Sequence, residues 1–467
     1  MNLANRDLVS IDDLSNGEIE ALFSLADKMS DSTDEQSGLC RGKIMASLFF
    51  EPSTRTKLSF EAGMLRLGGS VISAADIGAS SLAKGESIAD MAKVVGSYAD
   101  IIVIRHPWEG AAKVVADYAG IPVINAGDGS HEHPTQTLCD LYTIRKERQT
   151  IRGLRIALWG DLKRGRTVHS LIYALARFDA TILFCPGPGL EMPVHVLRRL
   201  STEYGGEVKS CRDLNQELET GPYPVDAIYR TPSSPHQLAM LPDISMQVEL
   251  NAGVDALYVT RLQKERQGPA TKEQELNKGY PVVDKKLLRG KGFRKALVMH
   301  PLPRVDELAY EVDADPRSMY FKQAAYGVPV RMALVALLLG VKEITIPGED
   351  DCLAPKAPYP VYARDSGVKC PNMNCVSNQE TEAKYIKPAF AIVSRAPLTL
   401  RCIYCDYELY PRYIASSEWH QGKVENKKYH SASSRFARNI KLENLIVFTS
   451  EEEAQAQQFK PSSYVSQ

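Results

Sequence analysis

Three features that the sequence lacks narrow its class before any motif is considered. Its 467 residues carry a formal net charge of −1, so we expect no strong electrostatic attraction to nucleic acid or to a membrane surface. The longest apolar run, near residues 328–341, is too short to span a bilayer and contains Arg331. The opening residues, MNLANRDLVSIDDLS, lack a basic segment followed by an apolar core. We therefore expect an intracellular, cytoplasmic protein with no membrane or nucleic-acid partner.

The composition indicates a globular protein of several domains. Hydrophobic residues make up 44% of the chain and charged residues 24%, and the length exceeds that of one ordinary domain. We expect two or three domains. Of the nine cysteines, four form two close pairs near the C-terminus. We interpret the other five, which are scattered, as small buried hydrophobic residues.

The clearest local pattern lies between Ile44 and Gly69. The apolar run 44–50 predicts a strand buried on both faces, which Pro52 ends. From Leu58 onward, apolar residues recur at helical spacing. The connection between strand and helix is Ser53-Thr54-Arg55-Thr56. Hydroxyls, backbone N–H groups and a guanidinium at a helix N-terminus suit a tetrahedral dianion, although an ordinary N-cap beside a solvated arginine has the same pattern.

The following segments alternate between strand and helix patterns. Strands are predicted at 70–73, 101–105 and 122–126, and helices at 87–98 and 110–118. This alternation favours a parallel α/β sheet, in which ligands bind beyond the carboxyl ends of the strands. Candidate polar residues occur at those ends: Arg105 follows one strand, and His133 and Gln136 begin a helix predicted at 134–148.

Two of these motifs resemble those of a known enzyme family. FEPSTRTKLSFE resembles the carbamoyl-phosphate loop of the aspartate and ornithine carbamoyltransferases, which implies that Ser53, Thr54, Arg55 and Thr56 bind phosphate. A cation at Arg105 can help to neutralise that phosphate. HPTQTLCDL resembles the motif in which the histidine hydrogen-bonds the carbamoyl carbonyl and the glutamine contacts its amide nitrogen. The resemblance assigns these roles to His133, and not His131, and to Gln136.

A loop at residues 80–86, SSLAKGE, resembles the one that a neighbouring subunit inserts into the active site in this family. The resemblance selects Ser81 and Lys84, with Ser80 as an alternative to Ser81. It implies a homotrimer, because head-to-tail contacts of this kind must close into a ring.

A second α/β unit is predicted from the strand at 155–160. The segment that follows, GDLKRGRTVHSL, is similar to aspartate rather than ornithine carbamoyltransferases. The resemblance implies that Arg166 binds the α-carboxylate of aspartate, a task suited to a bidentate guanidinium. At residues 300–304, HPLPR also favours the aspartate family, and the backbone carbonyls of Pro301 and Leu302 would receive the carbamoyl NH2 group. An apolar helix at about 324–339 is expected to return to the first domain.

A near-repeat leaves one strand assignment open. VDAIYRT at 225–231 echoes VDALYVT at 254–260, and either pattern fits the strand ahead of the second aspartate loop. Only the later copy continues as TRLQKER, which matches the family's TRxQxER. We therefore assign Arg261 to the side-chain carboxylate of aspartate, with Gln263 as its helper. Residues 222–251 are interpreted as an insertion that forms a surface loop.

The C-terminal part carries a second kind of signal. CPNMNC and CIYC supply Cys370, Cys375, Cys402 and Cys405, four thiolates that suit a closed, structural Zn²⁺ site. CPNMNC with the later CIYCDYEL resembles the zinc domain of the separate regulatory chain of aspartate carbamoyltransferase. The preceding linker is too short for that chain's nucleotide-binding domain, so regulation by nucleotides is in doubt. No function is assigned to residues 413–467.

The sequence favours one hypothesis about the fold, the domains and the reaction of this protein. The fold class is α/β, with two doubly wound parallel-sheet domains followed by a small β-rich zinc-binding domain. The expected boundaries are 1–150 for the carbamoyl-phosphate domain, completed by a helix at 323–343, then 151–322, a linker at 344–365, 366–412 for the zinc domain and 413–467 for an extension. The expected reaction joins carbamoyl phosphate and L-aspartate without an organic cofactor, and Arg55, Thr56, Arg105 and His133 are the catalytic residues. A nucleic-acid-binding zinc ribbon and a catalytically dead scaffold are the alternatives.

Overall fold

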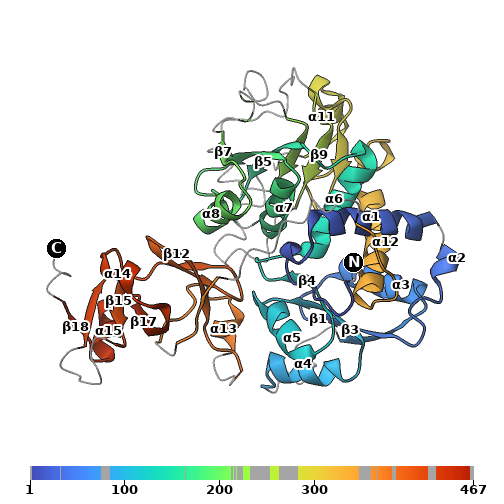
Figure 1. The fold of residues 1–467 in the computed structure, drawn as a ribbon. Coiled ribbons are helices and arrows are strands. Elements are labelled where there is room, and N and C mark those ends of the chain that lie inside the picture. Colours follow the sequence, from blue (N-terminus) through green and yellow to red (C-terminus); the bar gives the residue numbers. More distant parts are fainter. Residues whose placement is uncertain are drawn as a thin grey trace. The chain divides into compact units, whose positions relative to one another are not determined.

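The chain divides into two compact units in a computed structural model (Figure 1). The first comprises Met1–Ala75, Ala99–Ile104 and Ile121–Cys352, and the second comprises Asp76–Tyr98, Arg105–Gly120 and Leu353–Gln467. No described helix has both the length and the hydrophobicity needed to cross a membrane. The structure describes residues 3–31, 33–74, 85–163, 165–211, 214, 217, 225–231, 253–261, 282–346, 359–364, 367–380, 385–418 and 427–462.

A four-stranded sheet contains the first strands of the chain. Its order is β2 (Ser70–Ala74), β1 (Ile44–Phe49), β3 (Ile101–His106) and β4 (Val123–Asp128). β1 and β2 are parallel, and α3 (Thr54–Arg66) connects them. The order reverses direction between β1 and β3, which is the kind of switch point where open α/β sheets bind ligands. The strands predicted in this region are confirmed.

Helix α12 (Tyr320–Leu338) organises the core of the first unit. It packs against α1 (Asn16–Asp31), α3 and α6 (Pro134–Arg148), and it begins a few residues before the predicted helix. Residues on all its sides are buried, so its apolar sequence reflects contact with several neighbours. A capping box opens α1, since Glu18 N donates to Ser15 Oγ at 3.2 Å and Ser15 N donates to Glu18 Oε2 at 2.8 Å.

A six-stranded, all-parallel sheet forms the other half of the first unit. Its order is β10 (Leu297–Met299), β9 (Ala256–Val259), β8 (Ala227–Arg230), β5 (Arg155–Gly160), β6 (Thr181–Pro186) and β7 (Lys209–Ser210). Helices α7 (Arg166–Arg177), α8 (Val194–Glu203) and α11 (Lys285–Arg289) accompany it. The direction of winding reverses between β5 and β8, so this half also has a doubly wound sheet with a switch point.

The interpretation of residues 222–251 as a surface insertion is wrong for its first part. β8 lies in the interior of the sheet between β5 and β9, with Ala227 opposite Ala256, and all four of its residues are buried. Each copy of the near-repeat has the pattern of a buried strand, and that pattern does not distinguish one strand from two. Both copies form strands, and they are neighbours. Residues 232–251 lie outside the described part of the chain.

The interpretation of the five scattered cysteines as small buried hydrophobic residues is correct in burial for the four described ones, but two of them are bonded to each other. Cys185 in β6 and Cys211 directly after β7 form a disulfide across neighbouring parallel strands, with their Cα atoms 5.1 Å apart. Adjacent strands bring two sequence-distant thiols to bonding distance, which spacing alone does not reveal. Cys40 and Cys139 are buried, as predicted, and they are free, whereas Cys352 lies outside the described residues.

The described part of the second unit contains two longer helices, several short ones and two small sheets. α4 (Ile88–Gly96) and α5 (Ala111–Ala119) pack against each other. β11 (Val361–Tyr362), β12 (Phe390–Arg395), β13 (Leu398–Cys402) and β14 (Glu408–Leu409) pair antiparallel in that order, which confirms the β-rich cysteine domain. α13 (Val376–Gln379) is a short helix of the second unit, whereas the short elements η1 (Ile11–Asp13), α2 (Thr33–Gln36), η5 (Lys291–Phe293) and η6 (Tyr310–Ala314) belong to the first.

Residues after 412, to which no element is assigned from the sequence, form a further sheet. Its order is β17 (Leu445–Phe448), β15 (Tyr413–Ser416), β16 (Lys428–Ser431) and β18 (Lys460–Pro461), accompanied by α14 (Phe436–Asn439), η8 (Leu442–Asn444) and α15 (Glu451–Ala456). Tyr429, Phe448 and Phe459 lie in its small core. The extension is therefore a folded part of the protein.

Candidate active site and metal centre

The turn after β1 consists of Ser53, Thr54, Arg55 and Thr56, and we call it the STRT turn. It leads directly into α3. Ser53 is the N-cap of α3, with φ −159° and ψ 80°, and within the described residues its side chain makes no capping hydrogen bond. The first intrahelical bond runs from Lys57 N to Ser53 O, so the N–H groups of Thr54, Arg55 and Thr56 precede the helical ladder. Thr56 is buried and Arg55 is exposed. This geometry disfavours the ordinary N-cap interpretation and retains the features of an anion site.

His133 occupies the N-cap position of α6 and is buried. Its backbone N–H donates to Ser170 Oγ at 3.2 Å, and Thr135 Oγ1 lies 3.4 Å from its Nδ1. With Thr135 as donor to Nδ1, the proton of the neutral imidazole sits on Nε2. The ring is then equipped to donate a hydrogen bond from Nε2 to a carbonyl oxygen.

Residues 300–304 follow β10 and form a turn that we call the His300 turn. Three hydrogen bonds hold it in place. The backbone N–H of His300 donates to Gln323 Oε1 at 3.0 Å, and that of Leu302 donates to His300 Nδ1 at 2.7 Å. Because Nδ1 is an acceptor, Nε2 carries the proton and donates to Glu307 Oε1 at 2.8 Å. Burial lowers the pKa of His300, and the nearby positive charge of Arg55 acts in the same direction.

The proposed aspartate contacts fall at the ends of strands in the six-stranded sheet. Arg166 begins α7 after β5, although its side chain lies outside the described part. On the same helix, the half-buried His169 donates from Nε2 to the carbonyl oxygen of Leu162 at 2.9 Å, and desolvation lowers its pKa. Arg261 follows β9 and is partly exposed.

The other predicted site residues lie partly inside and partly outside the described part of the chain. Gln136 lies in the first turn of α6, and Arg105 is buried near the end of β3, in the second unit. Ser81, Lys84 and Gln263 lie outside the described residues. The sequence reasoning missed Asp140, Tyr258, Gln323 and Glu307, which bond to one another or to the His300 turn. One signal was available: Asp140 follows Gln136 by four residues on the same helix face.

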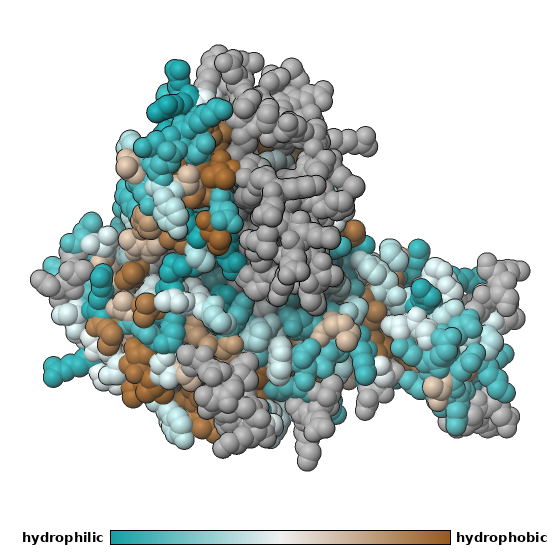
Figure 2. All heavy atoms as spheres, turned by 180° about the vertical axis from the view of Figure 1, so that it is seen from behind, coloured by the Kyte–Doolittle hydropathy of each residue, from teal (hydrophilic) through white to brown (hydrophobic). Residues whose placement is uncertain are grey.

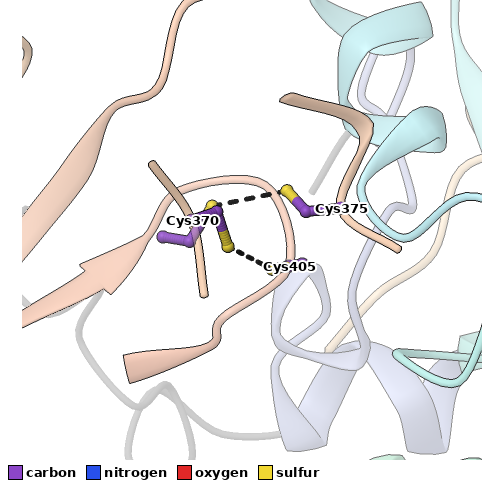
Figure 3. Close-up of side chains that lie close together, drawn as sticks. Cys370, Cys375 and Cys405 are labelled. Atoms are coloured by element: carbon purple, nitrogen blue, oxygen red, sulfur yellow. Dashed lines mark hydrogen bonds between the residues drawn. The ribbon is translucent and has the colours of Figure 1, made fainter. Parts of the chain in front are cut away.

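The four predicted cysteine ligands lie together in the second unit. Cys370 Sγ is 3.5 Å from Cys405 Sγ, and Cys375 Sγ is 3.7 Å from Cys402 Sγ. All four sulfur atoms lie within 4.8 Å of one another and all four residues are buried. Figure 3 shows the sulfur atoms of Cys370, Cys375 and Cys405 turned toward one another. A tetrahedral Zn²⁺ site with Zn–S bonds of about 2.3 Å has sulfur atoms about 3.8 Å apart, so the cluster fits a metal of this kind.

Comparisons with known proteins agree with this geometry. Residues 6–146 match the model of the aspartate/ornithine carbamoyltransferase carbamoyl-P binding domain, and residues 232–338 match that of the Asp/Orn binding domain. The aspartate carbamoyltransferase catalytic subunit of Thermoplasma acidophilum is 45% identical over 341 residues, which cover 72% of this chain and 99% of that protein. The chain belongs to the aspartate carbamoyltransferase family. The catalytic subunit of Methanopyrus kandleri is 46% identical over 341 residues, which cover 73% of this chain and 99% of that protein.

Solved aspartate carbamoyltransferase structures share the fold. The Trypanosoma cruzi enzyme in complex with carbamoyl phosphate and aspartate has a TM-score of 0.59 and 37% identity, and the match covers 72% of this chain and 98% of that one. The catalytic subunit from M. jannaschii has a TM-score of 0.57 and 42% identity, with the same coverage. Residues 365–415 match the metal binding domain of the aspartate carbamoyltransferase regulatory chain. The chain thus matches models of the two catalytic domains and of the metal binding domain of the regulatory chain.

Proposed function

We propose that the protein transfers the carbamoyl group of carbamoyl phosphate to the amine of L-aspartate, giving N-carbamoyl-L-aspartate and phosphate for pyrimidine biosynthesis. The observation that carries the proposal is the STRT turn at the N-terminus of α3, where three backbone N–H groups precede the helical ladder beside hydroxyls and an exposed arginine. In this assignment Ser53, Thr54, Arg55 and Thr56 bind the phosphate. Arg166, Arg261 and Gln263 bind the two carboxylates of aspartate.

The proposed mechanism relies on position and charge. The amine attacks the carbamoyl carbon, and the developing oxyanion is stabilised by Arg105, Thr56 and Nε2–H of His133. The C–O bond to phosphate then breaks, and the phosphate takes the amine proton. Gln136 and the carbonyls of Pro301 and Leu302 accept hydrogen bonds from the carbamoyl NH2. Holding two anions together in a preorganised electrostatic site supplies most of the rate acceleration.

We also propose a homotrimer in which Ser81 and Lys84 complete the site of a neighbouring subunit. Support comes from α3, whose second apolar stripe faces solvent. Phe60 and Met64 are buried, whereas Leu58 is 57% and Leu65 61% exposed, and Ile72 on the neighbouring β2 is 40% exposed. Figure 2 shows hydrophobic residues exposed among hydrophilic ones on the rear of the molecule. An exposed stripe of this kind is typical of a subunit interface.

For the cysteine cluster we propose structural zinc. The two knuckles have the spacing of a closed site, and all four of their cysteines are free and buried. We also propose a cytoplasmic location for the protein. We further propose the domain division 1–150 with the helix at 323–343, 151–322, a linker at 344–365, 366–412 and 413–467.

Contacts within the second unit support a role for the zinc domain in assembly or regulation. The backbone of Glu109, just before α5, donates to Asn374 O at 3.0 Å and accepts from Val376 N at 2.9 Å. Asn374 Nδ2 also donates to Pro107 O at 2.9 Å. The knuckle that holds Cys370 and Cys375 is thus bonded to the segment between β3 and α5 of the same chain.

One assay tests the catalytic proposal. Purified full-length protein is incubated with carbamoyl phosphate and L-aspartate, and carbamoyl aspartate and phosphate are measured together. Equal amounts of both products are expected. Absence of carbamoyl aspartate, with carbamoyl phosphate intact, would overturn the proposal.

A further inference from the structure

A buried carboxylate, Asp140, lies where three segments of the first unit meet. Its Oδ1 accepts hydrogen bonds from Gln136 Nε2 at 2.8 Å, Tyr258 OH at 2.9 Å and Gln323 Nε2 at 2.9 Å. The donors come from α6, β9 and α12, and Asp140 is only 1% exposed. A buried carboxylate is costly unless donors surround it, so these three side chains are strongly held in their orientation.

The carboxylate decides which end of the Gln136 amide faces it. Because a carboxylate oxygen accepts, the NH2 group of Gln136 turns toward Asp140, and its carbonyl oxygen Oε1 is left as an acceptor on the other side. Burial raises the pKa of Asp140 to about 7. Either charge state keeps this orientation, since Oδ2, which has no hydrogen-bond partner among the described residues, is the atom that takes a proton.

The same carboxylate orients Gln323. The Nε2 of Gln323 faces Asp140, and its Oε1 therefore accepts the backbone N–H of His300 at 3.0 Å. His300 begins the turn whose next two carbonyls, those of Pro301 and Leu302, are assigned to the carbamoyl NH2. The Oδ1 atom of Asp140 thus orients Gln136 directly and the His300 turn through Gln323, and these two carry the proposed acceptors for the carbamoyl NH2.

We infer that Asp140 is a positioning residue that makes the site selective for a carbamoyl group by orienting the acceptors of its NH2. The inference rests on the proposed function, because it requires Gln136 and the His300 turn to contact that NH2. Acetyl phosphate is the matched probe. It keeps the phosphate and the carbonyl of carbamoyl phosphate but has a methyl group, which donates no hydrogen bond, where the NH2 group stands.

The test measures binding of carbamoyl phosphate, acetyl phosphate and inorganic phosphate to the full-length protein by calorimetry. In Asp140→Leu the preference for carbamoyl over acetyl phosphate is expected to fall about tenfold, the effect of losing one or two hydrogen bonds, with phosphate affinity changed by less than about twofold. Asp140→Asn retains an oxygen that can occupy the place of Oδ1 and should keep most of the preference. A merely structural role would weaken all three ligands alike.

Further variants show whether a loss of preference comes from misfolding. Together with the wild type, they distinguish the assigned NH2 contacts from the role of Asp140. Tyr142→Phe is the matched control, because it removes a hydrogen bond from α6 to Asp27 and should leave the preference unchanged. If Asp140→Leu does not fold, Gln323→Met tests the same link through the His300 turn and should lower the preference. A wild-type protein that does not distinguish the two acyl phosphates would refute the assigned NH2 contacts. A wild type that does, with folded variants that retain its full preference, would refute the role of Asp140 alone.

Discussion

Tyr229 and Tyr258 stack with their ring centroids 4.2 Å apart and their planes inclined by 11°. The two residues are partners in the register of β8 and β9. Their hydroxyls have different partners: that of Tyr229 lies 3.0 Å from Thr167 Oγ1, and that of Tyr258 donates to Asp140. Thr167 and Asp140 belong to α7 and α6, the helices that carry the proposed aspartate and carbamoyl contacts. The stack therefore links the two halves of the proposed site through buried side chains.

Replacing Arg55 with Ala tests the anion site. Loss of a preorganised charge at the reacting group typically costs a factor on the order of 10² to 10³, so kcat/KM should fall by about that factor. Steady-state kinetics measure the change, and Arg41→Ala, which removes an exposed arginine just before β1, is the control and should have little effect. An unchanged kcat/KM for Arg55→Ala would show that the turn is only a helix cap.

The substrate is expected to be a dicarboxylic amino acid. Arg261→Ala should raise KM for aspartate by about two orders of magnitude, because a charge-assisted bond to a carboxylate is lost, and should leave the affinity for carbamoyl phosphate nearly unchanged. Arg289→Ala, at the exposed end of α11, is the matched control. L-Ornithine should give no citrulline with the wild type, and detectable citrulline would contradict the assignment of two carboxylate-binding arginines.

Subunit exchange tests the shared active site. Lys84→Ala and Arg55→Ala proteins should each be nearly inactive, and mixed trimers should recover activity, because some sites then combine an intact loop with an intact phosphate turn. Exchange is verified by mass spectrometry of differently labelled subunits. No recovery in proven mixed trimers would place Lys84 in the site of its own subunit.

Removal of the metal should unfold the zinc domain and spare catalysis. Metal binding to thiolates in small domains supplies on the order of 10 kcal/mol of folding free energy, so chelation or Cys402→Ser should abolish hydrogen-exchange protection of residues 367–410. Isolated trimers should keep their turnover, since the proposed substrate contacts lie outside this domain. Metal analysis without zinc, or full protection in the variant, would refute the structural-zinc proposal.

The docking of the zinc domain depends on Gly110. This residue has φ +86°, and a Cβ there would lie 2.6 Å from Cβ and 2.7 Å from the carbonyl oxygen of Tyr404. Gly110→Ala should therefore release the zinc domain, measured as faster proteolysis of the C-terminal part. Gly120→Ala is the matched control: φ is +68° and nothing described lies within 4 Å, so it carries only the backbone strain of about 1 kcal/mol. Equal proteolysis of the two variants would contradict the contact.

The sequence by itself determined the local elements that carry chemistry. A buried strand, a polar turn and a helix follow from the pattern of residues 44–69, because each depends on neighbours along the chain. The four cysteines likewise predicted their own cluster, since the preferred geometry of a thiolate site restricts their spacing. The parallel α/β class followed from the alternation of strand and helix patterns.

Only the tertiary structure decided which strands are neighbours and which buried groups meet. The near-repeat became two adjacent strands, the thiols of Cys185 and Cys211 met across β6 and β7, and residues after 412 formed a sheet. Two hydrogen-bond partners of Asp140, Tyr258 and Gln323, lie more than a hundred residues from it in the sequence. Such pairings depend on sheet order and helix packing, which local hydrophobic periodicity does not encode because it records burial and not the identity of the neighbour.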